Sequence, residues 1–153
     1  MDNCVKDTVF IVADFGDSSN QEEITKKLEL MKETCSVLGL SAQSSKDFLG
    51  GGDAVRRIKK AIEDAEFIIC DISEPRGYAN PNVYYEFGFA HGCENDENDL
   101  FSICDKATFT RINEESQLPF DIRVEQIHIF DSDEELKKIV HDNLQYMIEQ
   151  RDI

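Results

Sequence analysis

The chain has 153 residues, of which 41% are hydrophobic and 31% are charged, a composition typical of one soluble globular domain. The formal net charge is −16, from 32 acidic and 16 basic residues, which argues against a nucleic-acid polymer as partner, although local donors suffice to hold a single nucleotide. No apolar run approaches the roughly 20 residues that a membrane span requires, so we expect no membrane partner.

The chain begins with MDNCVKDTVF, which lacks the basic segment and apolar core of a signal peptide, so we expect a cytoplasmic protein. Five cysteines occur, and none forms a CxxC pair. Cys35 falls on the apolar face of a predicted helix, and Cys70 falls in an apolar strand run. This distribution is typical of free, buried thiols in a reducing compartment.

Short apolar runs alternate with amphipathic segments along the whole chain. The first run, TVFIVA, begins at Thr8 and predicts a buried parallel strand, and a helical repeat in residues 22–40 follows that ends at Gly39. The other predicted strands are LSAQ (40–43), FIICDIS (67–73), LFSIC (100–104) and EQIHIF (125–130). The other predicted helices cover 54–65, 80–92 and 132–150, and their expected N-caps are Asp53, Asn80, and Ser132 or Asp133.

This alternation predicts one domain over residues 1–153 with an α/β, flavodoxin-like three-layer sandwich and a five-stranded parallel sheet in the order 2-1-3-4-5. In such sheets, ligands bind beyond the carboxyl ends of the strands, where the order switches between strands one and three. That rule selects the loops at 14–20 and 72–80. The long connection at 105–121 is expected to be partly helical and is a candidate flap.

The segment after the third predicted strand, ISEPRGYANPNVYYEFGFAHG (72–92), holds the most informative pattern. Asn80 before Pro81 predicts a helix start. Glu86 then lies about a turn and a half inside the helix, near the strand end at Asp71. Two interpretations stay open: a solvated surface glutamate, or a partly buried carboxylate that faces the crevice with Asp71 nearby, as a nucleophile or cation stabiliser does.

Motifs of several other classes are absent, including the P-loop, GxGxxG after a strand, GxSxG, HExxH and the zinc-deaminase pattern. His91 and Cys93 have no companions at metal-ligand spacing, so we expect no metal. The GGGD turn at 50–53, followed by Arg56 and Arg57, is a weaker candidate for holding a phosphate, with a flexible turn and a solvated basic pair as the alternative.

Two segments, CDIS (70–73) and NPNVYYEFGFAHG (80–92), resemble the signature of the TIR-like and nucleoside 2-deoxyribosyltransferase-like families of bacteria and archaea, and LPFDIR (118–123) resembles their Pro-Phe-Asp segment. The resemblance implies cleavage of an N-glycosidic bond. In the deoxyribosyltransferases the glutamate matching Glu86 attacks the anomeric carbon and holds a covalent ribosyl intermediate, and in the TIR branch it serves NAD cleavage. A fixed carboxylate stabilises the positive charge that develops on the ribose, although a glutamate that grips the ribose hydroxyls is an open alternative.

The resemblance also implies a set of substrate-binding residues around Glu86. They are Asp14, Phe15, Gly16, Asp71, Asn82, Tyr85 and Asp121. Asp71 would orient the sugar or the base, and Asn82 would hydrogen-bond a ribose hydroxyl or Glu86. Tyr85, or Tyr84 in its place, would stack on a base. The loop of Asp14, Phe15 and Gly16 would approach the base or the nicotinamide, and Asp121 would close the far side.

Three functions are compatible with these residues. The favoured one is a TIR-type NADase or cyclase in antiviral defence signalling, with NAD as substrate and no cofactor. The second is a nucleoside or nucleotide 2-deoxyribosyltransferase or hydrolase, and the third is a non-catalytic nucleotide-binding or assembly module. We expect a homo-oligomer, because a neighbouring subunit often completes related sites, and an effector role would require a separate sensor protein or self-association.

Overall fold

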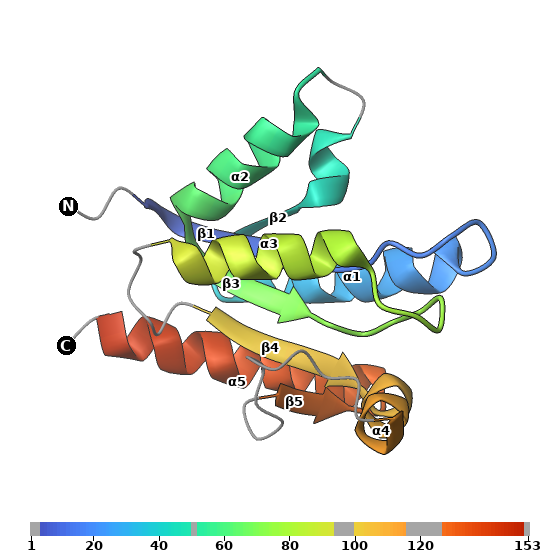
Figure 1. Cartoon of the computed structure of the whole chain (residues 1–153). Helices are drawn as coiled ribbons and strands as arrows, with labels where there is room; N and C mark the ends of the chain where they lie inside the picture. The colour runs from blue at the N-terminus through green and yellow to red at the C-terminus, as the bar shows by residue number, and fades with distance from the viewer. Residues whose placement is uncertain (1–3, 50–51, 94–99, 116–126, 152–153) are drawn as a thin grey trace.

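The computed structural model describes residues 4–49, 52–93, 100–115 and 127–151, in which strands and helices alternate (Figure 1). The strands are β1 (Val5–Val12), β2 (Ser41–Ser44), β3 (Ala65–Asp71), β4 (Leu100–Asp105) and β5 (Ile127–Phe130). The helices are α1 (Gln21–Val37), the short 3-10 helix η1 (Ser45–Phe48), α2 (Ala54–Asp64), α3 (Pro81–Gly92), α4 (Lys106–Glu115) and α5 (Asp133–Arg151).

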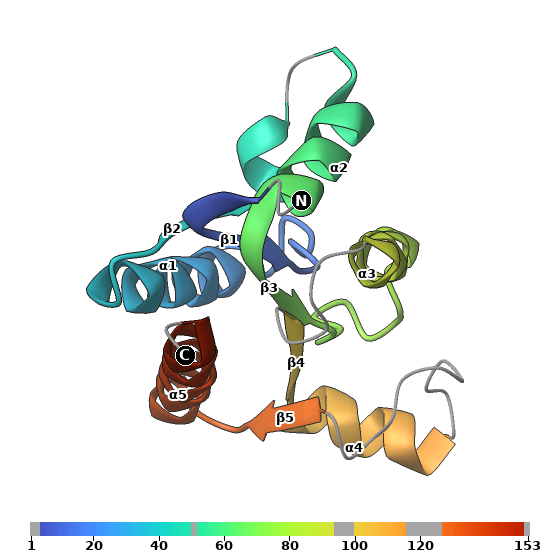
Figure 2. The ribbon, with the colours of Figure 1, turned by 90° about the vertical axis from the view of Figure 1, so that its left-hand side faces the viewer.

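All strand pairs are parallel, and the sheet order is β2-β1-β3-β4-β5, which confirms the predicted fold class. α1 and α5 cover one face of the sheet, and α2, α3 and α4 lie on the other (Figure 2). Because the chain moves to one side of β1 for β2 and to the other side for β3, the carboxyl ends of β1 and β3 lie side by side where the order reverses. This edge of the sheet is the expected ligand position.

Both faces of the central strands are buried because side chains along a strand point alternately to opposite faces. Val9 and Ile11 of β1 belong to the core under α1 and α5, whereas Phe10 and Val12 belong to the core under α2 and α3. A third, smaller cluster lies near α4 and contains Ile72, Cys104 and Ile127, with Phe109 packed against it. The apolar runs in the sequence are therefore strands buried on both faces of the sheet, as predicted.

The predicted helix ends agree with the structure at most positions. Asn80 Oδ1 accepts a hydrogen bond from the backbone N–H of Asn82 at 2.9 Å, and Ser132 Oγ accepts one from Glu135 N at 3.1 Å. Gly39 follows α1 with a φ of 79°, the left-handed conformation in which glycine ends helices. Asp53 occupies the predicted N-cap position of α2, but with a φ of 63° and without a side-chain cap hydrogen bond.

Other boundaries differ by a few residues. β1 begins at Val5 instead of Thr8, and the helix predicted within 105–121 is α4, which ends at Glu115. Cys35, Cys70, Cys93 and Cys104 are free thiols, as their spacing predicted. No helix among the described residues is both long and apolar enough to cross a membrane.

Candidate functional site

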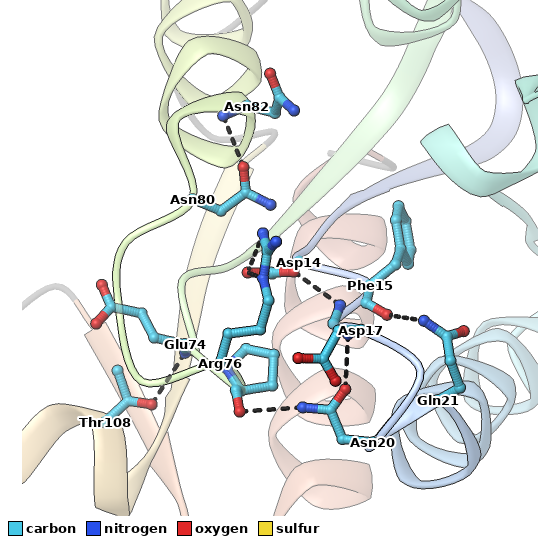
Figure 3. Close-up of polar contacts among 12 residues, drawn as sticks. Asp14, Phe15, Asp17, Asn20, Gln21, Glu74, Arg76, Asn80, Asn82 and Thr108 are labelled. Atoms are coloured by element: carbon cyan, nitrogen blue, oxygen red, sulfur yellow. Dashed lines mark hydrogen bonds and ion pairs between the residues drawn. The ribbon is translucent and has the colours of Figure 1, made fainter.

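Two loops meet at the carboxyl ends of β1 and β3, and side-chain contacts join them (Figure 3). Asn20 Nδ2 donates to the carbonyl oxygen of Pro75 at 3.1 Å, and Arg76 pairs with Asp14 across the same junction. Gly16 has a φ of 68°, and a Cβ there would lie 2.2 Å from Asn20 Oδ1. The loop after β1 therefore requires glycine at this position both for its conformation and for the space that Asn20 occupies.

The helix α3 begins where the Asn-Pro pair predicts. Asn80 caps the helix through the Asn82 N–H, and Pro81 occupies the first turn, where its missing N–H costs no hydrogen bond. The backbone oxygen of Asn80 accepts from Val83 N at 3.1 Å. Val83 and Ala90 pack into the core under α2 and α3, so one face of α3 is fixed against the sheet.

Glu86 lies on that inward face of α3 and is only 7% exposed. In the part of the chain that the structure describes, no group donates a hydrogen bond to the Glu86 carboxylate or forms an ion pair with it. Burial raises the pKa of the Glu86 carboxyl to about 7. The Glu86 charge also contributes, after burial, to raising the pKa of the Cys70 thiol, which places Glu86 close to the end of β3. A buried carboxylate that lacks partners is the pattern expected of a functional acid.

Asp71 does not share this environment: its carboxylate faces α1, although its charge, like that of Glu86, acts on the Cys70 thiol. Phe67 and Ile69 point into the core under α1 and α5, and Asp71, two residues after Ile69, faces the same side of the sheet. Its Oδ2 lies 2.7 Å from Lys27 Nζ on α1. Burial lowers the pKa of Lys27, but the attraction of Asp71 more than offsets this, so the pKa of Lys27 is raised. Asp71 is therefore the buried counter-ion of Lys27 on the opposite face of the sheet.

The first loop brings Asp14 and Gly16, two of its three predicted residues, together beyond the end of β1. Asp14 is 3% exposed, and its Oδ1 accepts from Gly16 N at 2.8 Å. Val12, two residues earlier, packs into the core under α2 and α3. Because alternate residues of a strand face the same side, Asp14 also faces the side of the sheet that α3 covers. Phe15 instead packs against the core under α1 and α5. The approach of this loop to a base stays a prediction, but the Phe15 side chain is turned toward the core and not toward the α3 side.

The residues predicted on α3 diverge around its circumference. Asn82 lies on the exposed first turn, so it does not share the burial of Glu86. Tyr85 is 53% exposed, and Lys59 Nζ of α2 lies 5.3 Å from its ring centroid. Tyr84 is the tyrosine nearer the strand ends: burial, followed by the charge of Glu74, raises the pKa of its phenol to about 12. The remaining predicted residue, Asp121, lies outside the described residues.

Sequence analysis missed two arginines at this edge of the sheet. Arg76 donates to Asp14 Oδ2 from Nε at 3.2 Å and from Nη2 at 3.1 Å. Arg111 of α4 forms an ion pair with Glu74, whose backbone N–H donates to Thr108 Oγ1 at 3.0 Å. The partners of both arginines lie far away along the chain, so no local pattern predicts these contacts. The one signal in the sequence was that Arg76 falls in a loop selected by the strand order.

A cavity among the described residues lies elsewhere. It has a volume of about 580 Å³ and lies between α2, η1 and the amino-terminal halves of β1 and β3. Its lining includes Arg56 and Arg57, the basic pair that follows the GGGD turn, but neither Glu86 nor Asp14. We place the candidate site at the strand ends, because the buried carboxylate and the switch in strand order coincide there and not at the cavity.

No family model matches the sequence, and no curated protein is similar to it at a significant level. Among solved structures, the fold is similar to that of the CMP N-glycosidase BcmB of Clostridium botulinum, with a TM-score of 0.57 and 18% sequence identity over 86% of this chain and 97% of that one. It is also similar to the flavodiiron protein of Giardia intestinalis, with a TM-score of 0.52 and 10% identity over 95% of this chain and 36% of that one. At these identities the likeness shows the fold.

Proposed function

We propose that this protein cleaves the N-glycosidic bond of a nucleotide and that Glu86 is its catalytic carboxylate. The observation that carries the proposal is the burial of Glu86 at the switch point of the sheet, where no described residue neutralises it and its pKa is raised to about 7. Burying a carboxyl without partners costs folding free energy, so a chemical role is the simplest reason for its presence.

The chemistry requires a negative charge beside the anomeric carbon. As the C1′–N bond breaks, its electron pair leaves with the base and positive charge develops on the ribose. An ionised Glu86 in a crevice of low dielectric stabilises that charge, either through space or by forming an ester with C1′. Water then supplies hydroxide to C1′, displacing Glu86 if an ester has formed, and its proton goes to a base that leaves as an anion or to solvent when the base leaves neutral, so hydrolysis consumes one water and oxidises nothing.

Two resemblances support this proposal. The Asn-Pro-Asn segment that leads to Glu86 resembles the signature of the TIR-like and nucleoside 2-deoxyribosyltransferase-like families. The structural neighbour that this chain covers almost end to end is a CMP N-glycosidase. The neighbour favours a nucleoside monophosphate as substrate, whereas the family signature also supports NAD. We therefore propose a nucleotide substrate and treat NAD, ribonucleotides and deoxynucleotides as arms of one experiment.

The experiment is chromatographic detection of free base after incubation of the protein with NAD, with ribo- and deoxynucleoside monophosphates, and with the matching nucleosides. Glu86→Gln keeps the shape of the side chain and removes its charge, and we expect it to lower base release by at least about 10²-fold. Glu29→Gln, on the exposed face of α1, is the matched control and is expected to retain full activity. Base release that is equal in wild type and Glu86→Gln would refute the proposal, and binding without release at high protein concentration would favour a non-catalytic module.

A further inference from the structure

The guanidinium of Arg76 is held in place at the mouth of the candidate site. Nε and Nη2 both donate to Oδ2 of the buried Asp14. The loop that carries Arg76 is tied to the loop after β1 by the Asn20–Pro75 hydrogen bond, and Gly77 N donates to Glu74 O at 2.9 Å within it. Little conformational entropy is therefore left to lose when a ligand contacts Arg76.

Arg76 also keeps donors that Asp14 does not use. A guanidinium carries five N–H groups in one plane, and Asp14 accepts from two of them. Both N–H groups of Nη1 have no acceptor in the part of the chain that the structure describes, and the side chain is 25% exposed. Arg76 Cζ lies over the ring of Tyr78, 5.2 Å from its centroid. The unused donors thus form a flat edge beside an exposed aromatic ring.

Arg76 lies on the same side of the sheet as Glu86. Arg76 pairs with Asp14, which lies two residues after the buried Val12 and therefore faces the same side of the sheet as Val12, the side covered by α3. Figure 3 shows the Arg76 guanidinium between Asp14 and the start of α3 at Asn80. Glu86 lies on the inward face of that same helix. A ligand that reaches from the anomeric carbon at Glu86 toward the loops therefore meets the Arg76 donors.

The surroundings of Arg76 suit a nucleobase better than a phosphate. Asp14 balances its positive charge, and the charge of Asp17 acts on it as well, in a chain with a net charge of −16. The first turn of α3 offers few free donors, because Pro81 has no N–H and the Asn82 N–H is already bonded to Asn80. A dianion would meet no net positive charge here, whereas a neutral base offers coplanar acceptors to a planar donor edge.

We propose that Arg76 donates hydrogen bonds to the acceptor edge of the leaving base and stabilises the negative charge that the base acquires as the C1′–N bond breaks. This proposal rests on the proposed N-glycosidic cleavage. It names the substrate class as nucleotides with a carbonyl beside the glycosidic nitrogen, as in pyrimidines, since that oxygen takes up the departing electron pair. Nicotinamide leaves NAD as a neutral molecule and gains little from such a donor.

The test compares two leaving groups in two variants. Arg76→Met is expected to lower kcat on CMP by about 10²-fold and kcat on NAD by less than about 5-fold, and Arg76→Lys is expected to recover part of the loss on CMP because it keeps a charge for Asp14. Lys138→Met, which removes an exposed positive charge from α5 far from the candidate site, is the control and is expected to change neither rate. An equal fall on both substrates in both Arg76 variants would mean that Arg76 only supports the loops, and would overturn the proposal.

Binding measured without turnover separates this proposal from the proposed function. In the Glu86→Gln background, calorimetry with CMP is expected to give a Kd about 10-fold weaker after Arg76→Met, and ribose 5-phosphate is expected to bind both proteins equally. An unchanged Kd for CMP would overturn the role of Arg76 even if base release is observed. A 10-fold loss with no base release from any substrate would retain the base contact and refute the catalytic function.

Discussion

The burial of Glu86 predicts that replacing it stabilises the protein in a pH-dependent way. The ordinary carboxyl pKa of 4.5 and the buried value of about 7 differ by about 2.5, and each pH unit corresponds to ~1.36 kcal/mol. Ionised Glu86 therefore costs the native state about 3 kcal/mol above pH 7. The pKa of Glu86 is higher in the folded than in the unfolded protein. The stability that protonated Glu86 contributes to the native state is therefore fully present below pH 4.5 and is lost as the pH rises through 7.

The assay is urea or thermal unfolding of wild type and Glu86→Gln at several pH values from 5 to 8.5. The variant is expected to gain about 3 kcal/mol at pH 8, or ~6–12 °C in Tm, and under about 1 kcal/mol at pH 5. Glu29→Gln is expected to stay within about 0.5 kcal/mol of wild type throughout. A gain that is equal at pH 5 and pH 8 would mean that folding does not shift the pKa of Glu86, and a loss of stability at pH 8 would mean that the native state stabilises the ionised carboxylate; either result would refute the reasoning.

Three further predictions concern stability and reactivity. Asp71→Asn leaves Lys27 without its buried counter-ion, so we expect a loss of about 3 kcal/mol in urea unfolding at pH 7, and a loss below about 1 kcal/mol would contradict a buried ion pair. Gly16→Ala is expected to cost at least about 1 kcal/mol in the same assay, because its left-handed φ and the nearby Asn20 exclude a Cβ, and an unchanged midpoint would argue against this loop conformation. Three cysteine thiols are buried and have a raised pKa: Cys35, Cys70 and Cys104. We expect them to react with a thiol reagent in urea but not in the native protein. Rapid labelling of all five cysteines in the native protein would disprove their burial.

The fold could be predicted from the sequence because its signals are local and repeated. Apolar β-branched runs alternate with amphipathic helices, and Asn80 with Pro81 marks the start of α3 through contacts within one turn. The strand order follows from rules on parallel sheets that need no knowledge of individual contacts. Helical periodicity left the placement of Glu86 open between a solvated surface and a partly buried position, and the structure decides for the buried one.

The side-chain partners at the site could not be predicted, since they depend on contacts between distant segments. Lys27 and Asp71 are far apart in the chain, and only their positions on α1 and at the end of β3 reveal that Asp71 faces away from Glu86. Arg76 finds Asp14 across 62 positions. The choice between Tyr84 and Tyr85 likewise depended on which neighbour packs against each face of α3.

The central claim is that ionised Glu86 drives base release, and the pH dependence of kcat/KM tests it most directly. This quantity reports the essential ionisations of the free enzyme, so we expect base release to fall about tenfold per pH unit well below pH 7 and to level off above pH 8. A nucleoside substrate provides the control, because the second pKa of a phosphate monoester is about 6 and a nucleoside lacks that ionisation. The profile is expected to be the same for both substrates and absent in Glu86→Gln. A rate that is flat from pH 5 to 9, or highest at pH 5, would contradict the role of Glu86 as a charged catalytic group.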